Sequence, residues 1–314
     1  IIMTTFLIGL VILFGGGLLY GRFVEKVFGP DDRPTPAVSI NDGVDYVPMK
    51  KGKNALIELL NIAGTGPILG PIQGILFGPI AFILIPIGCV LGGAMHDYLS
   101  GMISIRSKGK QMPALIKDHL GGKVYKIYNV FIIFLMILVG AVFIYTPGDL
   151  IVVNILKQES VVNNPVVWIV YGCIFVYYLA ATLFPIDKII GRIYPIFGFV
   201  LLLSAVGIFI GLFLKGYRLD NLTAANFAGA HPAGVPLLPV FFVTVACGIV
   251  SGFHSTQATL IGRSVSDERE GRHTFYDMMI LEGFIAMIWA AAAMGIYYKN
   301  IPPELIGKPA VIGL

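Results

Sequence analysis

The sequence predicts an all-α, polytopic membrane protein that crosses the bilayer about eight times. Hydrophobic residues make up 56% of its 314 residues, charged residues only 13%, and the mean hydropathy is +0.84. Soluble domains carry roughly 25% charged residues, so this composition excludes a soluble enzyme. It also excludes a disordered chain, because disorder needs low hydrophobicity.

Eight apolar segments are long enough to cross a hydrocarbon core that takes about 20 helical residues. Basic residues should then gather in the cytoplasmic loops. Of the 22 Lys and Arg residues, 17 fall on one side, in loops or at the adjoining span ends (Lys126 and Arg192), and 5 fall on the other side. This asymmetry places the N-terminus outside and the loops 21–54 and 104–124 in the cytoplasm. The predicted spans are Ile2–Tyr20, Ala55–Phe77, Pro79–Ile103, Tyr125–Tyr145, Val166–Phe184, Ile189–Leu214, Leu237–Ile261 and Thr274–Tyr298.

The first span is interpreted as a retained helix rather than a signal peptide, because Arg22 and Lys26 follow it and no basic segment precedes it. The loop 21–54 comes next and is long enough to be either functional or disordered. Its apolar residues, such as Tyr46 and Val47, predict an ordered segment that packs on the helices. A solvated linker is the alternative.

The second span, Ala55–Phe77, is interrupted at its middle by Gly64, Gly66 and Pro67. Proline removes a backbone donor and clashes with the preceding turn, and glycine leaves the backbone open to contact. Freed backbone groups are tolerated at membrane depth only where protein or a cavity surrounds them. The span is therefore predicted to be a broken helix of the kind that transporters use. Close helix packing along the glycines from Gly66 to Gly78 is the alternative.

The seventh span repeats this pattern, with Gly248, Ser251 and Gly252 near its centre. Two breaks five spans apart indicate a five-helix inverted repeat preceded by one extra helix. Residues 1–54 then form the extra helix and its loop, residues 55–214 the first repeat, and residues 215–314 the start of the second. Three further spans are expected, so the chain is expected to be a fragment of a longer protein.

The substrate is predicted to bind at the two breaks, where half-helix N-termini attract a carboxylate and half-helix carbonyls attract a cation. The predicted substrate-binding residues are Gly64, Thr65, Gly66, Pro67, Cys247, Gly248, Ser251, Gly252, His254, Ser255 and Thr256.

Ionisable residues within membrane spans are costly, so each one is a functional candidate. We take five as candidates, and each lies in the cytoplasmic half of its span: Glu58, His96, Asp97, His254 and Glu282. Asp277, at the start of the eighth span, is interpreted instead as a partner of the helix dipole. Glu58, His96, Asp97 and Glu282 are predicted to form a proton relay or inner gate, with Asn41, Asp42 and Asp45 of the loop as further gate residues. A static hydrogen-bonded network is the alternative. The acidic run 267–270 is interpreted as a solvated loop.

Other classes of site find no support in the sequence. The cysteines lie in apolar runs, and neither metal-ligand spacing nor a Walker motif occurs. We therefore expect no enzyme activity, no metal and no cofactor, and nucleic acid is not an expected partner. The expected partners are a small-molecule substrate, a coupling cation and membrane lipid. The oligomeric state stays open, with a homo-oligomer among the options.

Four blocks of the sequence together resemble the carbon starvation protein (CstA) family: Thr35–Pro48, Ile62–Pro71, Gly92–Asp97 and Ala246–His254. Glu282 also matches an acidic residue of that family, whereas Thr65 and Gln257 depart from its pattern. The resemblance implies a LeuT-like secondary transporter of the bacterial inner membrane that imports peptides or pyruvate. A channel and a non-transporting scaffold or sensor are the alternative functions.

Overall fold

The computed structural model describes residues 3–64, 66–183, 186–216, 219–227, 231, 234–249 and 254–300. Within these ranges every regular element is a helix, and β-pairing is limited to one isolated bridge between Met49 and Val265. Contacts divide the chain into two compact units, residues 1–112 with 197–314, and residues 113–196. The predicted division into repeats follows other boundaries and stays a prediction.

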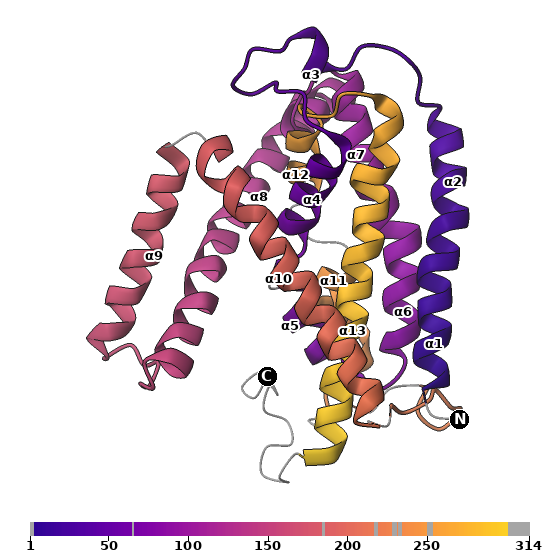
Figure 1. Cartoon of the computed structure of the whole chain (residues 1–314), viewed down its shortest axis with the longest axis vertical. Coiled ribbons are helices and arrows are strands. Elements are labelled where there is room, and N and C mark those ends of the chain that lie inside the picture. The colour runs from indigo at the N-terminus through magenta and orange to yellow at the C-terminus, as the bar shows by residue number, and fades with distance from the viewer. Residues whose placement is uncertain are drawn as a thin grey trace. The chain divides into compact units, whose positions relative to one another are not determined.

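The first unit begins with one long apolar helix made of α1 (Thr4–Val11), the π-helical turn η1 (Ile12–Gly16) and α2 (Gly17–Phe28). It runs beside a second long helix, made of α6 (Ala81–Gly88), the π-helical turn η3 (Cys89–Gly93) and α7 (Ala94–Arg106) (Figure 1). Gly9 permits this close packing, because a Cβ there would collide with the Phe82 carbonyl. A glycine in the interface lets two membrane helices approach closely.

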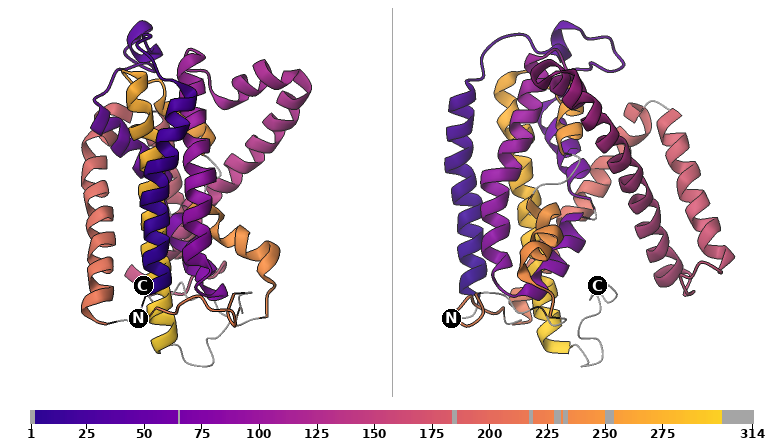
Figure 2. Two further views of the ribbon diagram at one scale, coloured as in Figure 1. Left: turned by 90° about the vertical axis from the view of Figure 1, so that its right-hand side faces the viewer. Right: turned by 180° about the vertical axis from the view of Figure 1, so that it is seen from behind.

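Helix α13 (Asp277–Asn300) runs through the middle of this unit, alongside both long helices (Figure 2). It follows the short turns η5 (Glu268–Glu270) and η6 (Arg272–Tyr276). Within its apolar window 78% of the residues are buried, whereas in the N-terminal helix the share is 28%. The four buried alanines at positions 290–293 have short side chains, so neighbouring helices can pack closely against α13.

The two predicted broken helices also belong to this unit. The first comprises α4 (Lys51–Ile62), α5 (Gly66–Gly74) and the 3₁₀ turn η2 (Ile75–Phe77), with a bend of 49° between its halves. The second comprises α11 (Leu237–Ile249) and α12 (His254–Ile261). α5 packs against α11 and α13, and α12 packs against α7 and α4.

The second unit contains α8 (Met112–Leu150), η4 (Ile151–Ile155) and α9 (Pro165–Leu183), and α10 (Ile186–Leu214) begins in it. Gly121 interrupts α8 at φ 83°, so part of the predicted loop 104–124 is helical. Only 6% of the apolar window of α8 is buried. Asp149 ties α8 to the chain that follows, accepting hydrogen bonds from Ser160 Oγ and from Tyr171 at 2.7 Å.

Five described helices are long and apolar enough to cross a membrane, or six if the bent α4–α5 pair counts as one span. They cover Thr4–Phe28, Ala81–Arg106, Met112–Ile155, Ile196–Leu214 and Glu268–Ile296. The predicted spans 166–184 and 237–261 also coincide with helices, but α9 is apolar only over Pro165–Ala180, and residues 250–253 lie outside the described ranges. The chain is a multi-pass helical protein, and the count of eight stays a prediction.

Candidate functional site

The first predicted break lies where α4 ends and α5 begins. The backbone leaves the helix at Ala63, with φ −78° and ψ 57°, and the Gly64 N–H donates to the Ile62 carbonyl at 2.8 Å. Helix α5 starts at Gly66, and Pro67 stands in its first turn, where backbone N–H groups have no partner within the helix. Thr65 lies outside the described residues.

At the second break, α11 ends at Ile249 and α12 begins at His254. Ser251 and Gly252 lie outside the described residues, as does the side chain of Cys247. A Cβ on Gly248 would lie 3.1 Å from both Pro71 and Ala286, so the end of α11 packs tightly on α5 and α13. The two helices that are predicted to be broken are therefore neighbours.

Ser255 and Thr256, the other substrate-binding residues predicted for this region, lie in the first turn of α12 and are partly buried. Their backbone carbonyls accept hydrogen bonds from the Thr259 hydroxyl, at 3.0 and 2.9 Å. The binding roles of all these residues stay predictions.

Four ionisable residues predicted within membrane spans meet in one buried cluster, to which α4, α7, α12 and α13 contribute Glu58, Asp97, His254 and Glu282. Each of the four is 0% exposed. His254 Nε2 lies 3.2 Å from Glu282 Oε2, and the Glu58 and Asp97 carboxyls lie within hydrogen-bonding reach of each other. The structure thus joins His254, predicted to bind substrate, to three of the acids predicted to relay protons.

His96, the fifth predicted residue, is exposed on α7. Asn41, Asp42 and Asp45 are exposed in the loop before α4. One Asp42 carboxylate oxygen accepts three backbone hydrogen bonds, from Val44, Asp45 and Tyr46, each at 2.9 Å. The bonds from Tyr46 and Val44 in particular lower the pKa of Asp42, because they stabilise the ionised carboxyl. Asp42 therefore stabilises the conformation of its own loop through these hydrogen bonds.

The near ends of α4 and α12 are tied together. The Met49 N–H donates to the Ser264 carbonyl at 3.0 Å, and Asn54 Nδ2 donates to that same carbonyl at 2.9 Å. The Ser266 hydroxyl in turn donates a hydrogen bond to the Met49 carbonyl at 3.1 Å. The buried side chain of Asn54 thereby anchors the start of the first broken helix to the segment that follows the second.

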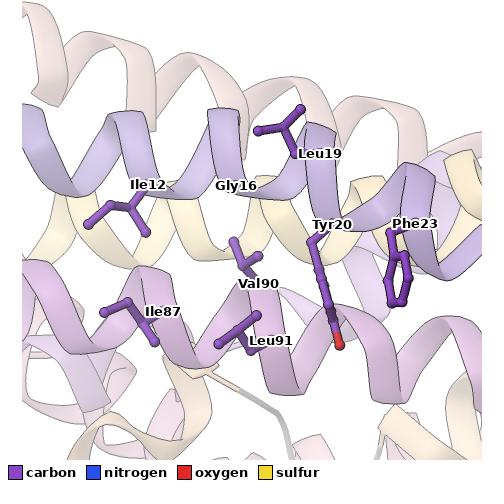
Figure 3. Close-up of a pocket in the computed structure, with 8 residues that line it drawn as sticks. All are labelled: Ile12, Gly16, Leu19, Tyr20, Phe23, Ile87, Val90 and Leu91. Atoms are coloured by element: carbon purple, nitrogen blue, oxygen red, sulfur yellow. The ribbon is translucent and has the colours of Figure 1, made fainter.

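A groove of about 410 Å³ lies between the N-terminal helix and the α6–η3 helix (Figure 3). The Tyr20 hydroxyl at its edge donates to Met95 Sδ at 3.3 Å. The groove is almost wholly apolar, and none of the predicted site residues lines it. Its lining residues are Ile12, Gly16, Leu19, Tyr20, Phe23, Ile87, Val90 and Leu91.

Comparison with known proteins decides the family. The sequence pattern of the family described as carbon starvation protein CstA matches residues 2–175 and 157–312, which together cover nearly the whole chain. The chain belongs to the CstA family. No solved structure matches the chain, so the LeuT-like fold expected from the resemblance stays a prediction.

Several relatives of the chain have names that describe transport, and one is described only as a membrane protein. A Haemophilus influenzae protein described as an uncharacterised membrane protein is 40% identical, over 95% of this chain and 92% of its own length. The peptide transporter CstA of Helicobacter pylori is 28% identical over 93% of this chain, and the pyruvate/proton symporter BtsT of Escherichia coli is 25% identical over 90%. This chain spans about half the length of the latter two, at 52% and 48%.

The structure also contains a buried acidic residue, Glu268, whose burial the sequence did not indicate. Residues 267–270 were predicted to be a solvated loop, but Glu268 is only 1% exposed, which corrects that prediction. Arg106 Nη2 donates to Glu268 at 2.9 Å, the Asp31 N–H donates to it at 3.2 Å, and Arg33 Nε lies 3.7 Å away. We call these four residues the Glu268 hub. Hydropathy could not reveal it, because an acid in a charged run resembles any surface residue.

Proposed function

We propose that this chain is the transporting core of a secondary transporter that imports small peptides or a small carboxylate such as pyruvate across the bacterial inner membrane. The observation that carries the proposal is a cluster of four buried ionisable side chains beside two neighbouring helices that are predicted to be broken. Ionisable residues at membrane depth mark ion and substrate pathways, and discontinuous helices mark transporter binding sites.

The substrate would bind at the helix ends around Gly64–Pro67 and Cys247–Thr256. The N-termini of α5 and α12 carry partial positive charge, which suits the carboxylate that pyruvate and peptides share. Alternating access about a five-helix inverted repeat would then expose this site to each side in turn. The names of the relatives support both substrate classes, peptides and pyruvate.

A cation gradient, with the proton as the coupling ion, would drive uptake. Two observations support this proposal: the acidic cluster at membrane depth and the proton symport named for the Escherichia coli relative. We assign the gate on the cytoplasmic side to the loop that carries Asn41, Asp42 and Asp45, because its neighbours Tyr46 and Met49 bond to the segments after α7 and α12.

The test is uptake of labelled pyruvate and of labelled dipeptides into proteoliposomes, with and without an inward proton gradient. We expect one substrate class to accumulate only when the gradient is present. Gly66→Val should abolish that uptake, because a branched side chain at the helix break would fill the space left for substrate.

Gly140→Val is the matched control, because a Cβ at Gly140 has nothing within 4 Å. It should insert and transport as the wild type does. Flux that ignores the gradient would indicate a channel and overturn the proposal. Full activity of Gly66→Val would overturn the site assignment.

A further inference from the structure

The charges of the buried cluster do not balance within the described part of the protein. Three carboxyl groups share the cluster with one imidazole, and all four side chains are fully buried. The charged groups that act on Asp97 are His254, Glu282 and Glu58, and those that act on Glu58 are Asp97 and Glu282. No Lys or Arg belongs to either set. An isolated ionised carboxylate is very costly to bury, so such a group is paired or takes up a proton.

Other titratable groups near the cluster add no permanent positive charge. His96 on α7 is exposed but near enough to affect His254, and the buried Cys89 thiol of η3 lies near Glu282 and Asp97. Cys89 donates its own hydrogen to the Met279 carbonyl at 3.3 Å. Helix α5 contributes no titratable side chain. In the part of the chain that the structure describes, no three His, Cys, Asp or Glu residues are arranged to hold a metal ion.

The contact between Glu58 and Asp97 itself requires a proton. An ionised carboxyl only accepts hydrogen bonds, and no donor among the described residues reaches an oxygen of either group. Two ionised carboxylates at this separation would repel each other strongly out of water. With one proton between them, one carboxyl donates to the other and the pair carries a single negative charge. A close contact between two buried carboxyls is therefore what a singly protonated pair would make.

The pair lies where its charge acts on the helix breaks. Glu58 stands one turn before Ile62, the last residue of α4, and its neighbour Glu282 contacts His254, the first residue of α12. Loss of the proton would therefore place a second negative charge, and repulsion between α4 and α7, directly beside both breaks.

We infer that Glu58 and Asp97 share one exchangeable proton and are the proton-binding site through which this transporter senses the gradient. The step is simple: the pair gains one proton from water on one side and returns it on the other. His254, which is paired with Glu282 at 3.2 Å, positions the pair. This inference rests on the proposed transport function, but the proton site has a readout that needs no substrate.

That readout is infrared spectroscopy of the full-length chain in lipid vesicles. A protonated carboxylic acid has a C=O stretching band that an ionised carboxylate lacks and that shifts on exchange into deuterated water. We expect the wild type to show such a band at neutral pH. Glu58→Gln and Asp97→Asn should each lose the same component, because the introduced amide donates to the remaining carboxyl and removes the need for a shared proton.

Glu25→Gln is the matched control, since Glu25 is a membrane-helix acid that is paired with Arg272 at 3.1 Å outside the cluster. Its band should equal that of the wild type. Equal bands in wild type, Glu58→Gln and Asp97→Asn would overturn the inference, even if uptake proves to be proton-driven. Loss of the band in both variants would support the proton site, even if neither pyruvate nor dipeptides are transported and the proposed function fails.

Discussion

At the scale of single residues, one glycine lets α11 approach the helix formed by α6, η3 and α7. Gly93, in the π-helical turn between α6 and α7, lies against the Ile249 carbonyl, the last of α11. A side chain at this position would collide with that backbone oxygen, and backbone cannot rotate away as a side chain does. The carbonyl is thus held beside the helix that carries Asp97, the acid of the proposed proton site.

Gly93→Val should therefore destabilise the protein, by at least the ~1–3 kcal/mol that overpacking typically costs. The measurement is the thermal unfolding midpoint in detergent, followed by size-exclusion chromatography. Gly92→Ala is the control at the adjacent position, where an added Cβ has nothing within 4 Å. An unfolding midpoint for Gly93→Val that equals that of Gly92→Ala would contradict the role given to the Ile249 contact.

At the scale of elements, hydrogen bonds and ion pairs connect loops and helix ends that have few apolar contacts of their own. The Glu268 hub joins the end of α7 to the loop after α2 and to the turn before α13. Arg106 also bonds the Gly29 carbonyl at 2.7 Å and lies 4.1 Å from the centre of the Phe28 ring. These contacts attach the loop after α2 to α7 and to the turn before α13, although the loop has little regular structure.

Glu268→Gln should loosen that loop. The substitution removes the charge that Arg106 and Arg33 share, and hydrogen bonds to charged groups contribute about 1.5–3 kcal/mol. We expect faster hydrogen exchange over residues 30–40, which include the Asp31 N–H, and a lower unfolding midpoint. Arg269→Gln should change little, because its pair with Asp32 is exposed on both sides and such pairs contribute about 0–1 kcal/mol. Similar exchange in the two variants would refute the hub.

At the scale of the whole molecule, the charge asymmetry has a structural counterpart within the first unit. Three segments predicted to be cytoplasmic meet at one end: the Tyr46 hydroxyl bonds Lys108, and Arg263 Nε bonds Gly109. At the other end, Asn221 accepts from the Thr5 N–H, and Thr5 Oγ1 accepts from the Leu222 N–H. Segments assigned to one side of the membrane thus contact each other.

Cysteine labelling tests which end faces the cytoplasm. Val44→Cys lies at the basic end and Ala225→Cys at the other, and both positions are exposed. A membrane-impermeant maleimide added to intact spheroplasts should label Ala225→Cys, whereas Val44→Cys should react only after permeabilisation. The wild-type chain, with its native cysteines, provides the background. The reverse pattern would invert the orientation predicted from the basic residues.

The sequence by itself determined the membrane class, the positions of most helices, the interruption at Gly64–Pro67 and the CstA resemblance. Each of these depends on the composition of one short segment, because hydropathy and glycine–proline content act locally. Only the tertiary structure decided that Glu58 meets Asp97, that His254 meets Glu282 and that Glu268 is buried. Those contacts join residues far apart in the chain, and whether an acid is solvated or paired depends on which helices pack around it.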